Sequence, residues 1–273
     1  MADMVPSTDG VTVALHDLGG SGPPLLLLHA NGFHGRCYTQ IARHLHDHFH
    51  VWAPDFRGHG DTITPDMALP WSGMVDDALA VLDHLGVDGP VRACGHSLGG
   101  AVVLRTELRR PGTILAAWLF EPIVFPGSQQ IPSGPNPMAD GARGRRHDFT
   151  SVDEAIAHYT GRGPFAAVTP EVLRDYVVHG FRPTNDGITL KCTGENEART
   201  FEGVDLDLFS RLDTLSLPVT VAGSGDGMPP ATAAPLVAAE LPDGHFAGWP
   251  EHSHFGPFED PRRAAAEIIA ALP

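Results

Sequence analysis

Basic residues and cysteines are few in this sequence, and long apolar runs are absent. It has 18 Lys and Arg against 33 Asp and Glu, a formal charge of −15 with histidine neutral. Because phosphate backbones and anionic membrane surfaces repel such a chain, neither nucleic acid nor a membrane surface is an expected partner. Cys37, Cys94 and Cys192 are too scattered for a disulfide framework, and none forms a CxxC pair. The apolar stretches are only a few residues long, so no membrane span is expected.

The first ten residues show no basic region followed by an apolar run, so no secretory signal is expected. The scarcity of cysteine agrees with a reducing setting, and we expect a cytoplasmic protein. Hydrophobic residues make up 42% of the 273 residues, enough to build a substantial core. The oligomeric state stays open, with a homodimer among the alternatives.

Short apolar segments alternate with helical patterns along most of the chain. Strands are predicted at residues 11–18, 24–28, 50–54, 91–94, 116–120 and 219–222. Helices are predicted at residues 38–46, 74–85, 101–108, 230–241 and 261–272. This alternation predicts an α/β fold, with a mostly parallel central sheet flanked by helices on both faces.

The alternation stops after the strand that ends near Phe120. Residues 126–203 contain a turn-rich stretch and two helical patterns, at residues 152–160 and 170–178. We therefore expect a core formed by residues 1–125 and 204–273, with a mainly helical cap inserted at residues 126–203.

Residues 95–99 carry the most informative motif, Gly-His-Ser-Leu-Gly, which fits the G-x-S-x-G turn with Ser97 at its centre. A predicted strand precedes this turn and a predicted helix follows it, which is the context that the motif requires. Small flanking residues are needed because the serine lies on a strained backbone between strand and helix. The pattern predicts that Ser97 is a nucleophile and that the Leu98 N–H, at the helix start, points toward the reaction centre.

Four segments in order resemble the α/β-hydrolase superfamily, over nearly the whole chain. They are His-Ala-Asn-Gly-Phe-His-Gly at residues 29–35, Asp-Phe-Arg-Gly-His-Gly at residues 55–60, the Ser97 motif, and His254-Phe255 followed by Glu259-Asp260-Pro261. The resemblance implies a serine hydrolase of the esterase or lipase kind, with a cap that sets substrate choice. It requires no metal and no organic cofactor.

Two positions depart from the family pattern. Ala30 stands where the family usually has glycine, and Ser253 stands where it has glycine before the histidine. By the pattern, the backbone N–H groups of Asn31 and Leu98 form the oxyanion hole. Because the Ala30 methyl restricts the loop, Gly32 or Phe33 remains an alternative donor to Asn31.

The base is expected to be His254, because the residues that follow it match the family pattern after the catalytic histidine. His252 and His245 are rival bases. The chain order Ser…Asp…His that the fold expects is met by Ser97, Asp226 and His254.

Asp226 is the preferred acid, because it lies in a glycine-rich turn directly after the strand at residues 219–222. Glu121 is the runner-up, since it also ends a strand at the same sheet edge. Asp213 is a weaker option, because it precedes a strand instead of following one.

Other suggestive residues lie near the predicted site or in the cap. Phe33, His34, His96 and Glu121 are candidates for the substrate pocket. The alternating histidines between His44 and His50 span the end of a helix and the start of a strand, so no metal site is expected there. The arginines of residues 143–146 are interpreted as a solvated cap loop, in preference to an anion site.

The predicted function is hydrolysis of a carboxylic ester or a related carbonyl compound, through a Ser-Asp-His triad and an acyl-enzyme. The substrate is expected to be a small molecule. Two alternatives would use the same triad, a cofactor-free haloperoxidase or perhydrolase and a C–C bond hydrolase. An alternative from another class is a non-catalytic ligand-binding protein of the same fold.

Overall fold

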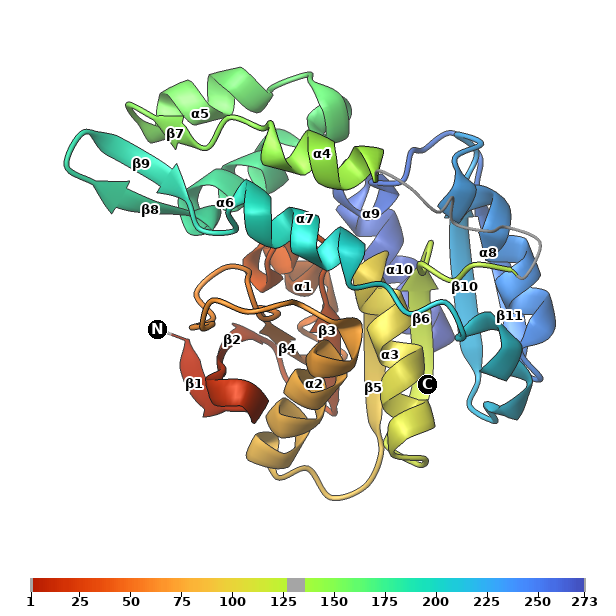
Figure 1. Cartoon of the computed structure of the whole chain (residues 1–273). Coiled ribbons are helices and arrows are strands. Elements are labelled where there is room, and N and C mark those ends of the chain that lie inside the picture. Colours follow the sequence, from red (N-terminus) through yellow and green to blue (C-terminus); the bar gives the residue numbers. More distant parts are fainter. Residues whose placement is uncertain (1, 127–135, 273) are drawn as a thin grey trace.

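The computed structural model describes residues 2–126 and 136–272 (Figure 1). The strands of its larger sheet are β1 (Asp3–Pro6), β2 (Thr12–Gly19), β3 (Pro24–Leu28), β4 (His50–Pro54), β5 (Val91–His96), β6 (Ile114–Phe120), β10 (Val219–Ser224) and β11 (Gly244–Trp249). Their order across the sheet is β1-β2-β4-β3-β5-β6-β10-β11. β1 and β2 pair antiparallel with their neighbours, and the strands from β4 to β11 run parallel. The predicted α/β class is confirmed.

All six predicted strands are present in the larger sheet, and the two strands of this sheet that were missed are the outer ones, β1 and β11. Within β1 only Val5 is buried, and β11 has exposed or half-buried residues up to Trp249. An edge strand covered on one side gives a weak apolar pattern. Sequence patterning therefore finds the buried middle of this sheet and misses its ends.

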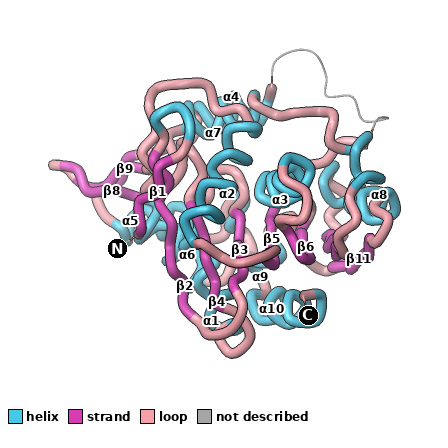
Figure 2. The backbone as a smooth tube through the Cα atoms, turned by 90° about the horizontal axis from the view of Figure 1, so that it is seen from below, coloured by secondary structure: helices cyan, strands magenta, loops and turns pink. Residues whose placement is uncertain are grey.

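Helices cover both faces of the sheet (Figure 2). Outside the segment between β6 and β10 they are α1 (Thr39–Leu45), α2 (Trp71–Leu85), α3 (Leu98–Arg109), α8 (Pro229–Glu240), α9 (Gly256–Glu259) and α10 (Pro261–Ala271). The continuous apolar run of β3 follows from burial of this strand on both faces. Leu26 and Leu28 pack with α2 and α3 on one face, and Leu25 and Leu27 pack with α1 and α10 on the other. No helix in the described part of the chain has the length and apolarity to cross a membrane.

A second group of elements, Pro137–Glu202, lies over one edge of the large sheet (Figure 1) and is named the cap segment here. It contains α4 (Pro137–Arg143), β7 (Asp148–Phe149), α5 (Val152–Tyr159), α6 (Pro170–Gly180), β8 (Phe181–Thr184), β9 (Gly187–Leu190) and α7 (Gly194–Glu202). The three strands form a small sheet in the order β7-β9-β8. The two predicted helices match α5 and α6, and the small sheet was not predicted. Residues 127–135 of the predicted cap lie outside the described residues.

Side-chain caps and loop contacts fix the helices of the cap segment. The N-cap side chains of Ser151, Thr169 and Thr193 accept hydrogen bonds from the first turns of α5, α6 and α7. Toward the core, the Asn196 side chain donates to the carbonyl oxygen of Gly58 at 3.2 Å. The cap segment therefore sits on the loops that follow the parallel strands.

Candidate active site

Ser97 lies between the end of β5 and the start of α3, as the motif predicts. Its backbone adopts φ 57° and ψ −117°, a conformation that non-glycine residues rarely adopt. A side chain at Gly99 would place its Cβ 2.1 Å from the Leu28 carbonyl oxygen, and one at Gly95 would place it 2.5 Å from the Gly100 Cα. The glycines thus let strand and helix close around a strained serine.

The turn that carries Ser97 is hydrogen-bonded directly to the end of the neighbouring strand β6. The Ser97 N–H donates to the Phe120 carbonyl oxygen at 2.9 Å, and the Ile123 N–H donates to the Ser97 carbonyl oxygen at 3.1 Å. These bonds hold Ser97 beside Glu121, the residue that follows β6.

His254 is bound through its ring to Glu121. Its Nδ1 lies 2.5 Å from Glu121 Oε2, and the Glu121 side chain is fully buried. The other carboxylate oxygen, Oε1, accepts from the Ser224 N–H at 2.6 Å. With Nδ1–H donating to the carboxylate, Nε2 of His254 is left to accept a proton.

The preference for Asp226 as the partner of the histidine ring is corrected by this geometry. Asp226 is exposed, and its Oδ2 accepts from the backbone N–H of His254 at 3.0 Å, while Oδ1 accepts from the Met228 N–H at 2.9 Å. Asp226 therefore holds the main chain of the histidine loop, and the runner-up Glu121 holds the ring.

Glu121 carries a second signature of a functional site. Among the described residues, the non-glycine residues with positive φ are Asp9, Ser97 and Glu121, the last at 44°. Strained backbone persists only where the surroundings enforce it, and it gathers at functional sites. Sequence reasoning had no signal for this conformation.

The rival bases and the third acid do not join this cluster. His252 packs against the Trp249 ring at 4.9 Å, and His245 is exposed on β11. Asp213 is exposed and precedes β10, so it lies at the opposite edge of the sheet. The unusual Ser253 binds Glu259 through its side chain and its N–H, which fixes the turn next to His254.

The backbone N–H groups of Asn31 and Leu98 have no hydrogen-bond acceptor among the described residues. The two alternative donors are engaged: the Gly32 N–H donates to His59 Nε2 at 3.2 Å, and the Phe33 N–H donates to the Ala30 carbonyl oxygen at 3.2 Å. The geometry therefore favours Asn31 over Gly32 and Phe33 as the donor in this loop.

A buried chain of hydrogen bonds connects this loop to the histidine loop. The Ala30 N–H donates to the Tyr38 hydroxyl at 3.2 Å, which lies 2.9 Å from His96 Nδ1. His96 Nε2 lies 2.8 Å from the carbonyl oxygen of His254. Burial lowers the pKa of His96 well below its usual value, so the ring is neutral and its Nε2–H donates. His96 thus links the two loops of the site.

Two more histidines hold the loops that follow β3 and β4. His29 Nδ1–H donates to the Ala30 carbonyl oxygen at 2.8 Å, and His29 Nε2 accepts from the Phe56 N–H at 2.9 Å. His34 lies under the cap segment, with Nε2 at 3.2 Å from the Tyr176 carbonyl oxygen. Burial lowers the pKa of His29 to about 3 and that of His34 to about 4. Both rings are therefore neutral structural groups at pH 7.

Protonation of these two rings should destabilise the protein in acid. In the unfolded chain both take up protons near pH 6.5, whereas in the fold they do so only near pH 3 to 4, so stability falls as pH drops below about 6.5. At pH 5 these two rings should together lower the unfolding free energy, relative to pH 7.5, by on the order of 4 kcal/mol, about 2 kcal/mol per histidine.

Urea unfolding at the two pH values measures this loss. The variant His34→Gln, which removes one imidazole, should show a pH dependence smaller by about 2 kcal/mol. Equal unfolding free energies of the wild type at pH 7.5 and pH 5 would contradict the assignment of neutral buried rings.

One group of side chains has the spacing of a metal-binding site. Ligand atoms of His16, Asp55 and Asp61 lie within 4.8 Å of one another. However, His16 Nε2 bonds Asp55 at 2.8 Å, and Asp61 pairs with Lys191 Nζ at 2.5 Å. Asp55 also accepts from the Gly35 N–H at 2.8 Å, so this cluster serves to anchor the loop after β3.

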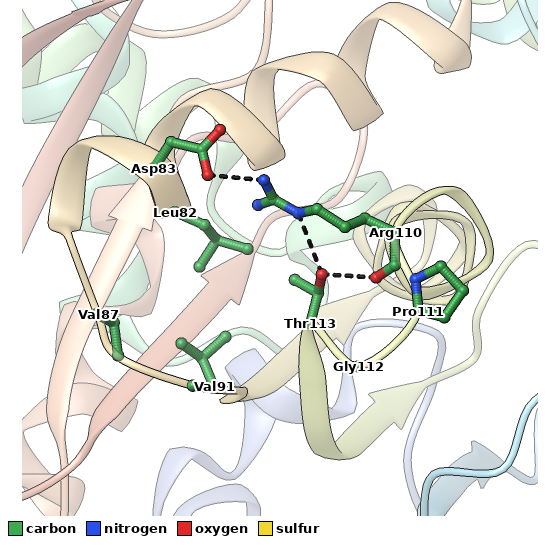
Figure 3. Close-up of a pocket in the computed structure, with 9 residues that line it drawn as sticks. Leu82, Asp83, Val87, Val91, Arg110, Pro111, Gly112 and Thr113 are labelled. Carbon is green, nitrogen blue, oxygen red and sulfur yellow. Dashed lines mark hydrogen bonds and ion pairs between the residues drawn. The ribbon is translucent and has the colours of Figure 1, made fainter.

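Two hollows of similar size differ in their relation to Ser97. A cavity of about 390 Å³ lies between the cap segment and the loop after β3, with Gly32 and Phe33 in its wall. A hollow of about 330 Å³, closed on one side by the Asp83–Arg110 ion pair, lies next to Val91, where β5 begins (Figure 3). Since Ser97 follows the other end of β5, the second hollow lies away from the candidate site, whereas the wall of the first includes Gly32 and Phe33, which directly follow Asn31. Of the four residues predicted to line the substrate pocket, Phe33 lines the cavity of about 390 Å³. His34, His96 and Glu121 form the hydrogen bonds described above and are not in its lining.

The turn at Ser97, His254 with its bound carboxylate, and the N–H groups of Asn31 and Leu98 lie at the carboxyl ends of the parallel strands. Open α/β folds place their sites at these strand ends. The sequence model described as "Alpha/beta hydrolase family" matches residues 25–268. The chain therefore belongs to the α/β-hydrolase family.

Relatives and solved structures agree with this assignment. Lipase LipV of Mycobacterium tuberculosis is 34% identical over 158 residues, which cover 57% of this chain and 56% of the lipase, so the match spans little more than half of that protein. A pimeloyl-[acyl-carrier protein] methyl ester esterase of Chromobacterium violaceum is 28% identical, covering 92% of this chain and 95% of the esterase. The crystal structure of E-2-(acetamidomethylene)succinate hydrolase superposes with a TM-score of 0.81 at 20% identity, covering 100% of this chain and 98% of that one. These relatives support a hydrolase.

Proposed function

We propose that the protein is a serine hydrolase that cleaves a carboxylic ester through Ser97, His254 and Glu121. The observation that carries the proposal is the bond of 2.5 Å between His254 Nδ1 and a fully buried carboxylate, beside a serine in a strained turn. A serine at its ordinary pKa is a poor nucleophile, and a histidine held by a carboxylate is the usual means of activating it.

The first half of the reaction forms the acyl-enzyme. His254 Nε2 takes the proton of the Ser97 hydroxyl as its oxygen attacks the ester carbonyl carbon. Glu121 keeps the ring in the tautomer with Nδ1–H and stabilises its positive charge. When the C–O bond of the ester breaks, His254 returns the proton to the leaving alkoxide, which departs as the alcohol.

The second half repeats these steps with water as the nucleophile. His254 removes a proton from water, the hydroxide attacks the acyl carbon, and Ser97 leaves as its hydroxyl with the proton from His254. In both halves the negative oxygen faces the N–H groups of Asn31 and Leu98, which have no other acceptor among the described residues. One such donor is worth on the order of 3 kcal/mol in other serine hydrolases.

The ester as substrate is supported by the relatives, whose names include a lipase and a methyl ester esterase. The substrate is a small molecule, as the cavity of about 390 Å³ implies, because ligand pockets are commonly about 300 to 1,000 Å³. No step of this mechanism requires a metal or an organic cofactor.

Turnover of short p-nitrophenyl and methyl esters tests the proposal. We expect saturable hydrolysis that gives acid and alcohol in equal amounts, with one oxygen of the acid derived from isotopically labelled water. If the protein is instead a non-catalytic binder, no ester should be hydrolysed above the buffer rate. If its reaction is peroxide-dependent halogenation or C–C cleavage, the corresponding assays should exceed ester turnover, and the proposal would fail.

A further inference from the structure

The cavity beside the candidate site is walled by two different parts of the chain. Gly32 and Phe33 of the loop after β3 form one side, and the cap segment forms the other. Three aromatic rings of the cap segment line it, those of Tyr159, Phe165 and Tyr176. Phe33 packs between this aromatic group and the histidine loop, with its ring centroid 5.3 Å from that of Tyr176 and 5.6 Å from that of Phe255.

The charged groups of this cavity are mainly basic, in contrast to the acidic chain around it. Arg145 and Arg162 line it together with His158, and Glu197 is the only carboxylate in its described lining. With histidine neutral, two arginines and one glutamate give the lining a net charge of +1, whereas the whole chain carries −15. A small cavity of opposite sign concentrates an anionic ligand within it.

The two arginines differ in what they already bind. Arg145 is held by Glu197, and its Nη2 donates to the Tyr176 hydroxyl at 2.6 Å. Arg162 is exposed, and its guanidinium has no hydrogen-bond or ion-pair partner among the described residues. Arg145 therefore neutralises the glutamate beside the oxyanion loop, and Arg162 supplies the uncompensated charge. Arg143 and Arg146 are exposed, as the solvated loop expected from the sequence requires, and they pair with glutamates, whereas the Arg145 side chain is only 19% exposed, which that interpretation did not expect.

The mechanism indicates which part of an ester enters the cavity. The leaving alcohol must receive its proton from His254, so it lies on the histidine side of Ser97. The carbonyl oxygen faces Asn31, whose neighbours Gly32 and Phe33 form the cavity wall. With the alcohol assigned to the histidine side and the carbonyl oxygen to Asn31, the cavity beyond Gly32 and Phe33 is the space assigned to the acyl chain.

We propose that the cavity selects esters whose acyl chain ends in a carboxylate, and that Arg162 binds this carboxylate while the aromatic rings pack against the chain. The substrate class is thus the half-ester of a dicarboxylic acid, hydrolysed to the dicarboxylate and an alcohol. This inference rests on the proposed function, because it assigns the acyl group to a catalytic Ser97.

The experiment compares matched methyl esters by the release of methanol. One series comprises monomethyl esters of straight dicarboxylic acids of roughly five to eight carbons, sized to the cavity, and the other comprises methyl esters of monocarboxylic acids of equal length. In the wild type, kcat/KM for the best half-ester should exceed that for its neutral counterpart about fivefold, a preference that shrinks in high salt.

Variants of Arg162 identify the group responsible. Arg162→Gln should lower kcat/KM for the half-ester about three- to fivefold, the range expected for one solvent-accessible ion pair, and leave the neutral ester within about twofold. Arg162→Lys should keep most of the preference, and Arg162→Glu should abolish it. The matched control is Arg174→Gln, which removes the same charge from an exposed position of α6 outside the cavity lining and should change neither substrate.

Two results would overturn the inference while leaving the proposed function intact. One is equal kcat/KM of the wild type for both series, and the other is an equal loss for both substrates in Arg162→Gln. Failure of the proposed function would give a different result, since then neither ester series would show turnover that depends on Ser97.

Discussion

Replacing Ser97 by alanine should lower kcat for ester hydrolysis on the order of 10⁴-fold or more. In the proposed mechanism the serine oxygen forms the bond to the acyl carbon, so its removal leaves only the oxyanion donors and binding to assist attack by water. KM should change little, because Ser97 is 7% exposed and provides little of the binding surface. Steady-state kinetics with a methyl or p-nitrophenyl ester measures both constants.

The fold should tolerate this substitution. Alanine has the same Cβ as serine, so the contacts around the strained turn remain, and the Ser97 backbone bonds to Phe120 and Ile123 are unchanged. Thermal unfolding of wild type and variant should therefore agree within a few degrees. A variant that unfolds normally and keeps its ester turnover would refute a catalytic role of Ser97.

Replacing Glu121 by glutamine should lower kcat on the order of 10² to 10⁴-fold, at nearly unchanged KM. The glutamine oxygen can still accept from the Ser224 N–H, but the amide does not stabilise the charged imidazole and permits the wrong tautomer. The loss should therefore be catalytic and not structural, which near-wild-type thermal unfolding and near-wild-type KM would check.

Asp226→Asn is the matched comparison, because it makes the same change at the other candidate carboxylate. The asparagine oxygen still accepts from the His254 backbone N–H, so kcat should fall about fivefold or less, the value of one weakened hydrogen bond. A larger loss from Asp226→Asn than from Glu121→Gln would restore Asp226 as the acid and contradict the geometry described above.

The order of strands explains why the sequence led to Asp226. Glu121 follows β6 and Asp226 follows β10, so each lies at the carboxyl edge and each is a plausible acid. In the sheet, β6 lies next to β5, the strand that Ser97 directly follows, while β10 lies one strand farther away. Neighbours in a parallel sheet are set by crossover packing, and the linear pattern does not encode them.

Motifs with local geometry were the most predictable parts of the site. The G-x-S-x-G turn requires its flanking strand and helix, and β5 and α3 are found there. For the oxyanion loop, the sequence left Asn31, Gly32 and Phe33 open. The distinction depends on His59, a residue far along the chain that accepts from the Gly32 N–H.

The cap segment was predictable only in part, because its small sheet has little apolar patterning. β7 has two residues, and β8 is exposed after Phe181. The rings of Tyr159, Phe165 and Tyr176 are buried, and their spacing along the chain is irregular. Tertiary packing, and not local periodicity, brings these rings together.

The proposed activation of Ser97 by His254 and Glu121 can be tested without knowledge of the substrate. The measurement is the second-order rate constant for phosphonylation by a fluorophosphonate, with the modified residue located by mass spectrometry. We predict one adduct, on Ser97, formed at least about 100-fold more slowly in Glu121→Gln and within about fivefold of the wild-type rate in Asp226→Asn. An adduct on another residue, or an unchanged rate in Glu121→Gln, would contradict this triad.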